Sequence, residues 1–331
     1  MIWFVFSLIA LLCWSGSDFF SKAGTRQNDK NSHWKVVFAV GLVMGIHFII
    51  TLIGGAIIDN TCGVDAVPKF VASLFYTDFQ FMDFVRYLPV AGLYILAMVF
   101  GYIGLRYIEL SISSPICNSS GALAFVLCLI VGLTSADDVS IPAIIGVVLV
   151  TVGIVGLGFV ENREDDEVKL ARQEKSNRKY AKSILAFLLP IAYLIIDALG
   201  TVGDEFIFAI EDEAGNGIIT DYAANSAFEL TFFLLAIFAF IFIKFVKKDN
   251  VFKGNKHFFL GGACETVGQV FYMAVMFSDF TVGMVIISAY CALSVLWSRI
   301  FLKEQLSWKH YLTIAIVFAG IMVLGVAEEL L

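Results

Sequence analysis

The sequence has little charge for its length. Only 15% of its 331 residues are Asp, Glu, Lys or Arg, whereas a soluble globular domain has about 25%. Hydrophobic residues make up 59%, and the mean hydropathy is +0.86. A soluble domain with this balance would leave much of its apolar surface in water, so the shortage of charge excludes that class and places the chain in a lipid bilayer.

Basic stripes, clustered metal ligands and catalytic motifs are also lacking. The net charge is −7 without a basic stripe, which excludes nucleic acid as a partner. The four histidines, at positions 33, 47, 257 and 310, are scattered, so we expect no metal site. No GxSxG motif and no Walker-type loop is present. We therefore expect neither a cofactor nor an enzyme.

Paired cysteines are missing as well. The chain has six cysteines and no CxxC pair. Only Cys62 falls in an expected loop, and the other five lie inside apolar runs, at positions 13, 117, 128, 264 and 291. This distribution excludes a disulfide framework and is typical of cysteines that act as small hydrophobic residues.

The sequence contains many long apolar runs. A helix needs about 20 apolar residues to cross the hydrocarbon core of a bilayer. Runs of that length predict ten transmembrane helices, near residues 2–23, 35–58, 86–107, 112–133, 140–160, 183–202, 219–243, 257–277, 281–302 and 310–327.

The connecting segments differ in charge. The odd-numbered loops hold 20 of the 22 basic residues, whereas the long even-numbered segments 59–83 and 203–221 are acidic. Loops rich in Lys and Arg face the cytoplasm. We therefore expect a multi-pass protein of the cell (inner or plasma) membrane with both termini outside.

One charged linker divides the chain. Residues 161–182 are the only long, highly charged connector, so we expect a first five-helix repeat over 1–160, a charged cytoplasmic linker over 161–182 and a second repeat over 183–331. The linker is expected to be solvated, with a regulatory or partner-binding role as the alternative.

The ends of the two halves are similar in sequence. Residues 136–158 align with residues 303–325, which pairs Asp137 with Glu304 and Gly153 with Gly320. Because five is an odd number, two five-helix repeats must have opposite orientations in the membrane. The sequence therefore predicts an all-α integral membrane protein with ten transmembrane helices in two inverted five-helix repeats. Such proteins bind substrate near the bilayer midplane, between the repeats.

Two segments carry a family resemblance. The run CWSGSDFFSKAG at residues 13–24 and the run KEQLSWKHYLTIAIVFAGIMVLG at residues 303–325 resemble the drug/metabolite transporter superfamily, specifically its ten-helix EamA-like members. Trp14, Gly16, Asp18 and Lys22 fit the first-helix pattern of that family. The resemblance implies a transporter for a small organic metabolite, with a central cavity lined by helices 1, 3, 4, 6, 8 and 9. It also implies cytoplasmic termini, contrary to the charge count.

Polar residues inside the apolar runs are the candidate substrate site. A charged side chain at the bilayer centre costs at least about 2.5–3.5 kcal/mol, so such residues usually face a bundle interior or a wet cavity. Many of them recur at i, i+4 spacing and so share a helix face. When the first helices of the two halves are aligned in sequence, Asp18 and Asp197 occupy matching positions. The expected substrate-binding residues are Trp14, Asp18, Asn118, Tyr193, Asp197, Glu265, Gln269, Tyr272 and Tyr290.

Coupling and gating residues are a second set. Asp18, Asp197 and Glu265 are the candidates for exchanging a proton. Lys22, Asp137 and Glu304 are assigned gating or structural roles, with Lys22 at the cytoplasmic rim and Glu304 in an ion pair near the surface. The alternative for Asp18 and Lys22 is a solvated i, i+4 ion pair. His47 is interpreted as a structural histidine, and Glu229 as partly solvated.

These observations predict a secondary transporter, either an exporter or a proton-coupled carrier, that moves a small organic metabolite such as an amino acid, an amine or a sugar by alternating access. Its expected partners are that small molecule, the lipid bilayer and protons, whereas the oligomeric state is left open. Two alternatives remain. One is a membrane scaffold or receptor, and the other is a membrane enzyme without a recognisable motif.

Overall fold

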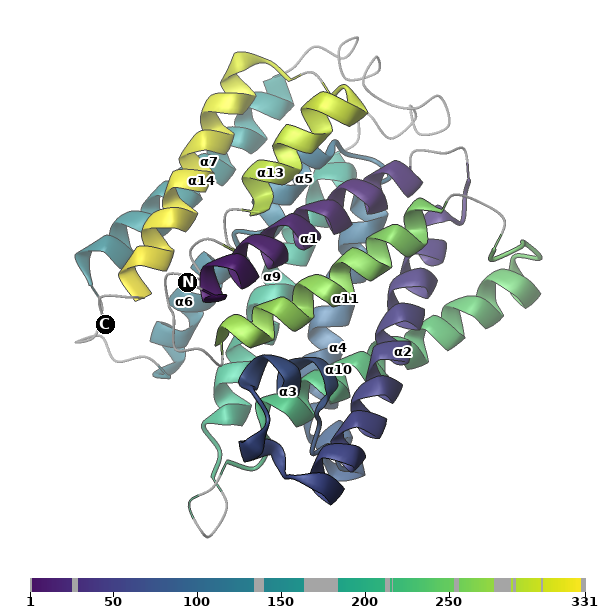
Figure 1. Ribbon diagram of the computed structural model, residues 1–331. Helices are drawn as coiled ribbons and strands as arrows, with labels where there is room; N and C mark the ends of the chain where they lie inside the picture. The colour runs from purple at the N-terminus through teal and green to yellow at the C-terminus, as the bar shows by residue number, and fades with distance from the viewer. Residues whose placement is uncertain are drawn as a thin grey trace.

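The computed structural model describes residues 2–25, 29–133, 140–163, 184–211, 215, 217–252, 256–276, 287, 290–304 and 306–328. These residues are mostly helical (Figure 1). The helices are α1 (Ile2–Thr25), α2 (Ser32–Thr61), α3 (Lys69–Phe75), α4 (Phe81–Gly104), α5 (Leu110–Cys117), α6 (Ser120–Val131), α7 (Ile141–Arg163), α9 (Ile184–Phe208), α10 (Asp221–Ile241), α11 (His257–Met276), α13 (Tyr290–Trp297) and α14 (Trp308–Glu328).

Eight helical segments of the described part are long and apolar enough to cross a membrane. Two further apolar segments, Tyr290–Leu302 and Trp308–Val323, are shorter. The all-helical membrane class is thus confirmed, whereas the count of ten spans stays a prediction. Boundaries differ by a few residues from those expected, and α7 continues to Arg163, into the predicted linker. Asp137 and residues 164–182 of that linker lie outside the described residues.

The outward faces of these helices carry large apolar side chains. Ile53 of α2, Val155 of α7 and Phe238 of α10 are each more than half exposed (58%, 67% and 53%). Exposed apolar surface of this extent is unfavourable in water and suited to lipid. The polar groups that the helices bury are therefore directed inward.

The fourth predicted span is broken into two helices. Between α5 and α6 the chain turns at Asn118 and Ser119. The Asn118 side chain donates to the Ser114 carbonyl (2.9 Å), and the Ser119 hydroxyl donates to the Pro115 carbonyl (2.7 Å). Side chains that bond to the preceding turn compete with the helix ladder and bend helices. Ser114 before the break and Ser120 after it both line the cavity described below.

Helices from the two halves of the chain pack against one another. The main pairs are α1 with α11, α4 with α9, α2 with α10 and α7 with α14 (Figure 1). In chain order, α1, α2, α4 and α7 of the first half correspond to α9, α10, α11 and α14 of the second half. When each helix is replaced by its counterpart, the pair α1–α11 turns into α9–α4, and the pairs α2–α10 and α7–α14 stay the same. Two repeats related by a two-fold axis would produce this pattern.

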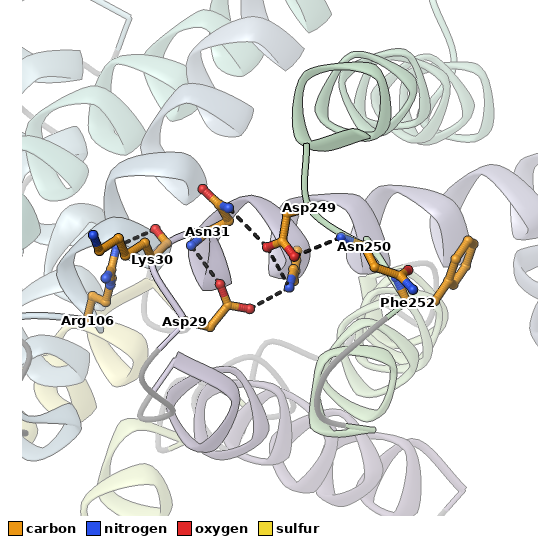
Figure 2. A network of polar contacts seen from close by, with 8 residues as sticks. Asp29, Lys30, Asn31, Arg106, Asp249, Asn250 and Phe252 are labelled. Carbon is orange, nitrogen blue, oxygen red and sulfur yellow. Dashed lines mark hydrogen bonds and ion pairs between the residues drawn. The ribbon is translucent and has the colours of Figure 1, made fainter. Parts of the chain in front are cut away.

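Three odd-numbered loops meet at one end of the bundle. Figure 2 shows Asp29 and Asn31, before α2, beside Asp249, which follows α10. Lys35 pairs with Asp29 (2.5 Å) and with Asp249 (3.1 Å), and Asn31 donates to Asp249 (3.0 Å). Arg106, after α4, donates to the Lys30 carbonyl (2.6 Å). The loops predicted to share one membrane side therefore contact one another.

The acidic even-numbered segments meet at the opposite end. The Thr220 hydroxyl donates to Asp78 (2.7 Å), and the Ser226 hydroxyl donates to Thr77 (2.7 Å). These contacts join the segment between α2 and α4 to the start of α10. The cavity described below lies between these two ends.

Candidate functional site

A central cavity of about 470 Å³ lies among the helices of both halves. All nine predicted substrate-binding residues are in its wall. They come from α1 (Trp14, Asp18), from the break after α5 (Asn118), from α9 (Tyr193, Asp197), from α11 (Glu265, Gln269, Tyr272) and from α13 (Tyr290). The structure therefore brings the whole set together, and its role in binding stays a prediction.

Asp18 is held by hydroxyl groups from both halves. Its carboxylate accepts hydrogen bonds from Ser114 of α5 (2.6 Å) and Ser294 of α13 (2.8 Å). One turn earlier in α1, the Trp14 ring packs against Tyr272 in a tilted arrangement and against Tyr290 edge to face, with ring centroids 5.1 and 5.6 Å away. This end of the cavity thus combines a carboxyl group with three aromatic rings.

Helix α9 contributes two carboxyl groups to the wall. Asp197 accepts a hydrogen bond from Ser120 (2.6 Å). Asp204, seven residues further on the same face, accepts from Tyr87 (2.6 Å) and Tyr94 (2.7 Å). Asp204 was not among the predicted site residues, because the predicted helix ended at residue 202 and the acid was counted with the loop. Its i, i+7 spacing from Asp197 is the signal that could have identified it.

Helix α11 presents one polar stripe to the cavity. Glu265, Gln269 and Tyr272 share this stripe, as predicted from their spacing. The Gln269 amide donates to Asn225 of α10 (3.2 Å), another residue of the wall. The stripe is thereby connected to the neighbouring helix.

The described residues of the cavity wall carry acidic and no basic side chains. Five carboxyl groups line it, and none of the described lining residues is Lys, Arg or His. The acids are Asp18, Asp197, Asp204, Asp221 and Glu265. Aromatic rings attract cations through their faces and carboxylates attract them by charge. Chemically, the cavity is suited to a positively charged organic group.

Lys22 is buried, although it contacts the connection between α4 and α5 at the basic end of the bundle. Its side chain is only 6% exposed, and its ammonium donates to the carbonyls of Leu105 (2.6 Å) and Ile108 (2.5 Å), between α4 and α5. The interpretation of Lys22 as one half of a solvated pair is therefore wrong. Burial of a lysine requires such partners, because an ammonium without them is costly in a dry site.

Glu304 makes a different contact from the ion pair predicted for it. Its carboxylate accepts from the backbone amides of Leu110 (3.1 Å) and Ser111 (3.0 Å) and from the Ser111 hydroxyl (2.6 Å). These amides are at the start of α5, where the first N–H groups of a helix lack intrahelical partners. Glu304 therefore caps a helix of the other half.

His47 and Glu229 form a buried pair that the sequence did not reveal. Nδ1 of His47 in α2 lies 2.7 Å from Oε1 of Glu229 in α10. Glu229 is 0% exposed, so its interpretation as partly solvated is wrong. Sequence spacing could not predict the pair, because the two residues are 182 positions apart.

The described residues contain no group of three or more His, Cys, Asp or Glu side chains that could hold a metal ion. All six cysteines are free, and Cys62 is exposed. The polar groups of the site are therefore carboxyls, hydroxyls and amides.

Comparison with known proteins gives one family match, over part of the chain. No curated protein matches the chain in sequence. A family model does match, over residues 206–326, which include α10, α11, α13 and most of α14. The resemblance expected from the sequence is thus confirmed: this multi-pass membrane protein matches, over its second half, the EamA-like transporter family of the drug/metabolite transporter superfamily.

Proposed function

We propose that the protein is a secondary transporter that moves a small organic cation, such as an amine, by alternating access. The observation that carries the proposal is the cavity wall, in which five carboxyl groups and several aromatic rings occur without a basic side chain among the described lining residues. An amino acid would place its own carboxylate among these acids, and a sugar would leave their charges unpaired. A cation satisfies both the carboxyls and the rings.

The same carboxyls support a coupling mechanism. An ionised acid inside a membrane is unfavourable unless it binds a proton or another cation. Asp18, Asp197 and Glu265 are therefore proposed to bind either the substrate or a proton, so that loading one releases the other. As two inverted repeats exchange the side on which the cavity opens, such competition would couple the two fluxes.

The alternatives are less well supported. An enzyme that uses a serine or cysteine commonly holds it beside a histidine or lysine base, and the described wall carries neither, so carboxyl groups would have to serve as the base there. A scaffold or receptor would not need several acids around a cavity in the membrane interior.

The test is ligand-induced thermal stabilisation of the purified protein. Choline is the probe, and dimethylbutanol, its uncharged carbon analogue, is the control ligand. We expect choline alone to stabilise the protein. Asp18→Asn, Asp197→Asn and Glu265→Gln should each weaken choline binding by about tenfold or more, because each removes a charge-assisted contact.

Glu205→Gln is the matched control variant. Glu205 is an exposed acid of α9 that does not line the cavity, so its loss should leave choline binding unchanged. Equal stabilisation by choline and dimethylbutanol, or undiminished choline binding in all three cavity variants, would contradict the proposal.

A further inference from the structure

The His47–Glu229 pair lies behind the cavity wall rather than in it. Neither residue lines the cavity, and they belong to α2 and α10. A fully buried carboxyl without a partner is costly, and the imidazole 2.7 Å away supplies one. Because both groups can carry a proton, the pair is more than a packing contact.

Two amide side chains connect the pair to the cavity. Asn225 donates from its amide nitrogen to Oε1 of Glu229 (3.3 Å). The amide oxygen of Asn225 accepts from Gln269 (3.2 Å). Asn225 and Gln269 both line the cavity. A hydrogen-bonded chain therefore runs from the cavity wall through Asn225 to Glu229 and His47.

The pair also has an unused hydrogen-bonding atom. Oε2 of Glu229 is buried and has no hydrogen-bond partner among the described residues, and Nε2 of His47 is buried as well. The group that faces His47 from α3 is the Leu74 backbone. On Glu229, the facing groups are His47 and Asn225. Apart from the pair itself, no ionisable side chain of the described residues acts on either group, so within that part of the chain only the partner in the pair can offset a proton gained or lost there.

We propose that the His47–Glu229 pair is a proton-binding site, separate from the substrate cavity and coupled to it through Asn225 and Gln269. One proton from water binds to the pair and later returns to water, and no other bond changes. Loss of the proton leaves a carboxylate on Glu229, which strengthens its hydrogen bond from Asn225 and fixes the amide that Gln269 contacts. A substrate that binds at Gln269 is therefore sensitive to the protonation of the pair, and the reverse follows by linkage.

The coupling in this inference rests on the proposed function, so the test measures proton movement and substrate exchange separately. The full chain is reconstituted in vesicles that contain a pH indicator. In the first assay, a choline gradient across the vesicle membrane drives proton movement, which the indicator records. In the second assay, choline has the same concentration on both sides, and labelled choline reports its exchange across the membrane. In Glu229→Gln and His47→Gln we expect exchange to persist while about one proton fewer moves per choline, because the pair binds one. His33→Gln, the same change in the same helix, should alter neither.

The outcomes are distinguishable. An unchanged proton-to-choline ratio in both pair variants, with exchange intact, would overturn the inference. If the pair variants do not fold, Asn225→Leu replaces them, since it keeps both ionisable groups, and an unchanged ratio in that variant would have the same meaning.

Failure of choline exchange in the wild type would count against the proposed function instead. In that case, an infrared difference spectrum between two pH values, recorded without choline, tests the pair alone. The inference predicts a carboxyl band that Glu229→Gln removes and Asp197→Asn leaves, and its absence would overturn the inference.

Discussion

Three of the five carboxyl groups in the described cavity wall are held by hydroxyls. Asp18, Asp197 and Asp204 all accept from Ser or Tyr side chains rather than from a basic residue. Hydroxyl donors fix the position of an acid without neutralising it, so its charge remains available to a ligand. Glu229, by contrast, faces an imidazole and is removed from the cavity. The type of partner thus separates the cavity acids, which are open to a substrate or a proton, from the acid proposed to bind a proton outside the cavity.

Single residues were predictable where one helix carries the signal. The i, i+4 spacing in α1, α9 and α11 found three of the five acids of the described wall, Asp18, Asp197 and Glu265, because spacing alone decides which side chains share a helix face. The partners of Lys22, Glu229 and Glu304 were not predictable, since they come from other helices and depend on how these pack.

Asp249 gives a pH-dependent contribution to stability. A hydrogen bond from Asn31, together with Lys35, holds the pKa of this carboxyl below its ordinary value of about 3.9. A lowered pKa in the folded protein contributes stability that is present above the unfolded value and is lost as pH falls through the folded value. We therefore expect Asp249→Asn to lower stability near neutral pH by at most about 1 kcal/mol.

This difference should shrink when thermal unfolding in detergent is followed to acid pH below about 4, because the wild-type carboxylate then becomes protonated. A difference that grew on acidification would contradict the role of the three-loop cluster in Figure 2.

At the scale of helices, two glycines allow a close approach. Gly153 of α7 and Gly320 of α14 occupy matching positions in the aligned halves. A Cβ on Gly320 would lie 2.7 Å from the Val150 amide nitrogen, and one on Gly153 would lie 2.9 Å from that of Val317. The two contacts are reciprocal, which supports the repeat predicted from the sequence.

The glycine contacts lead to a packing prediction. Gly153→Val and Gly320→Val should each destabilise the protein by about 1–3 kcal/mol, because a side chain there would meet backbone atoms that cannot move aside easily. Gly92→Val is the matched control, since nothing lies within 4 Å of a Cβ at that position of α4. Thermal unfolding in detergent measures all three, and equal losses would refute the packing explanation.

Element boundaries were less predictable than element positions. The apolar runs located the main helices, but the division of the fourth span into α5 and α6 depends on the local hydrogen bonds of Asn118 and Ser119. The start of α5 depends further on Glu304, which is nearly 200 residues away. Hydropathy contains no information on either.

For the molecule as a whole, the two ends differ in charge and give a testable orientation. Cys62 lies in the acidic segment after α2 and is exposed, whereas the other cysteines are at least partly buried. If the basic loops face the cytoplasm, an impermeant maleimide should label Cys62 from outside intact cells. Cys62→Ser should abolish that labelling. If Cys62 were labelled only after the cells are opened, the predicted orientation would be wrong, whereas the description of the cavity would be unchanged.

The central claim concerns the whole molecule, because the cavity is built from both halves and, in the proposed transport cycle, opens to each side in turn. The most direct test is the uptake of labelled choline by vesicles that contain the purified protein. We predict uptake that Asp197→Asn reduces at least about tenfold, that Glu205→Gln leaves intact and that dimethylbutanol does not inhibit. Uptake that is equal in wild type and Asp197→Asn, or that the uncharged analogue inhibits as strongly as unlabelled choline, would contradict the account.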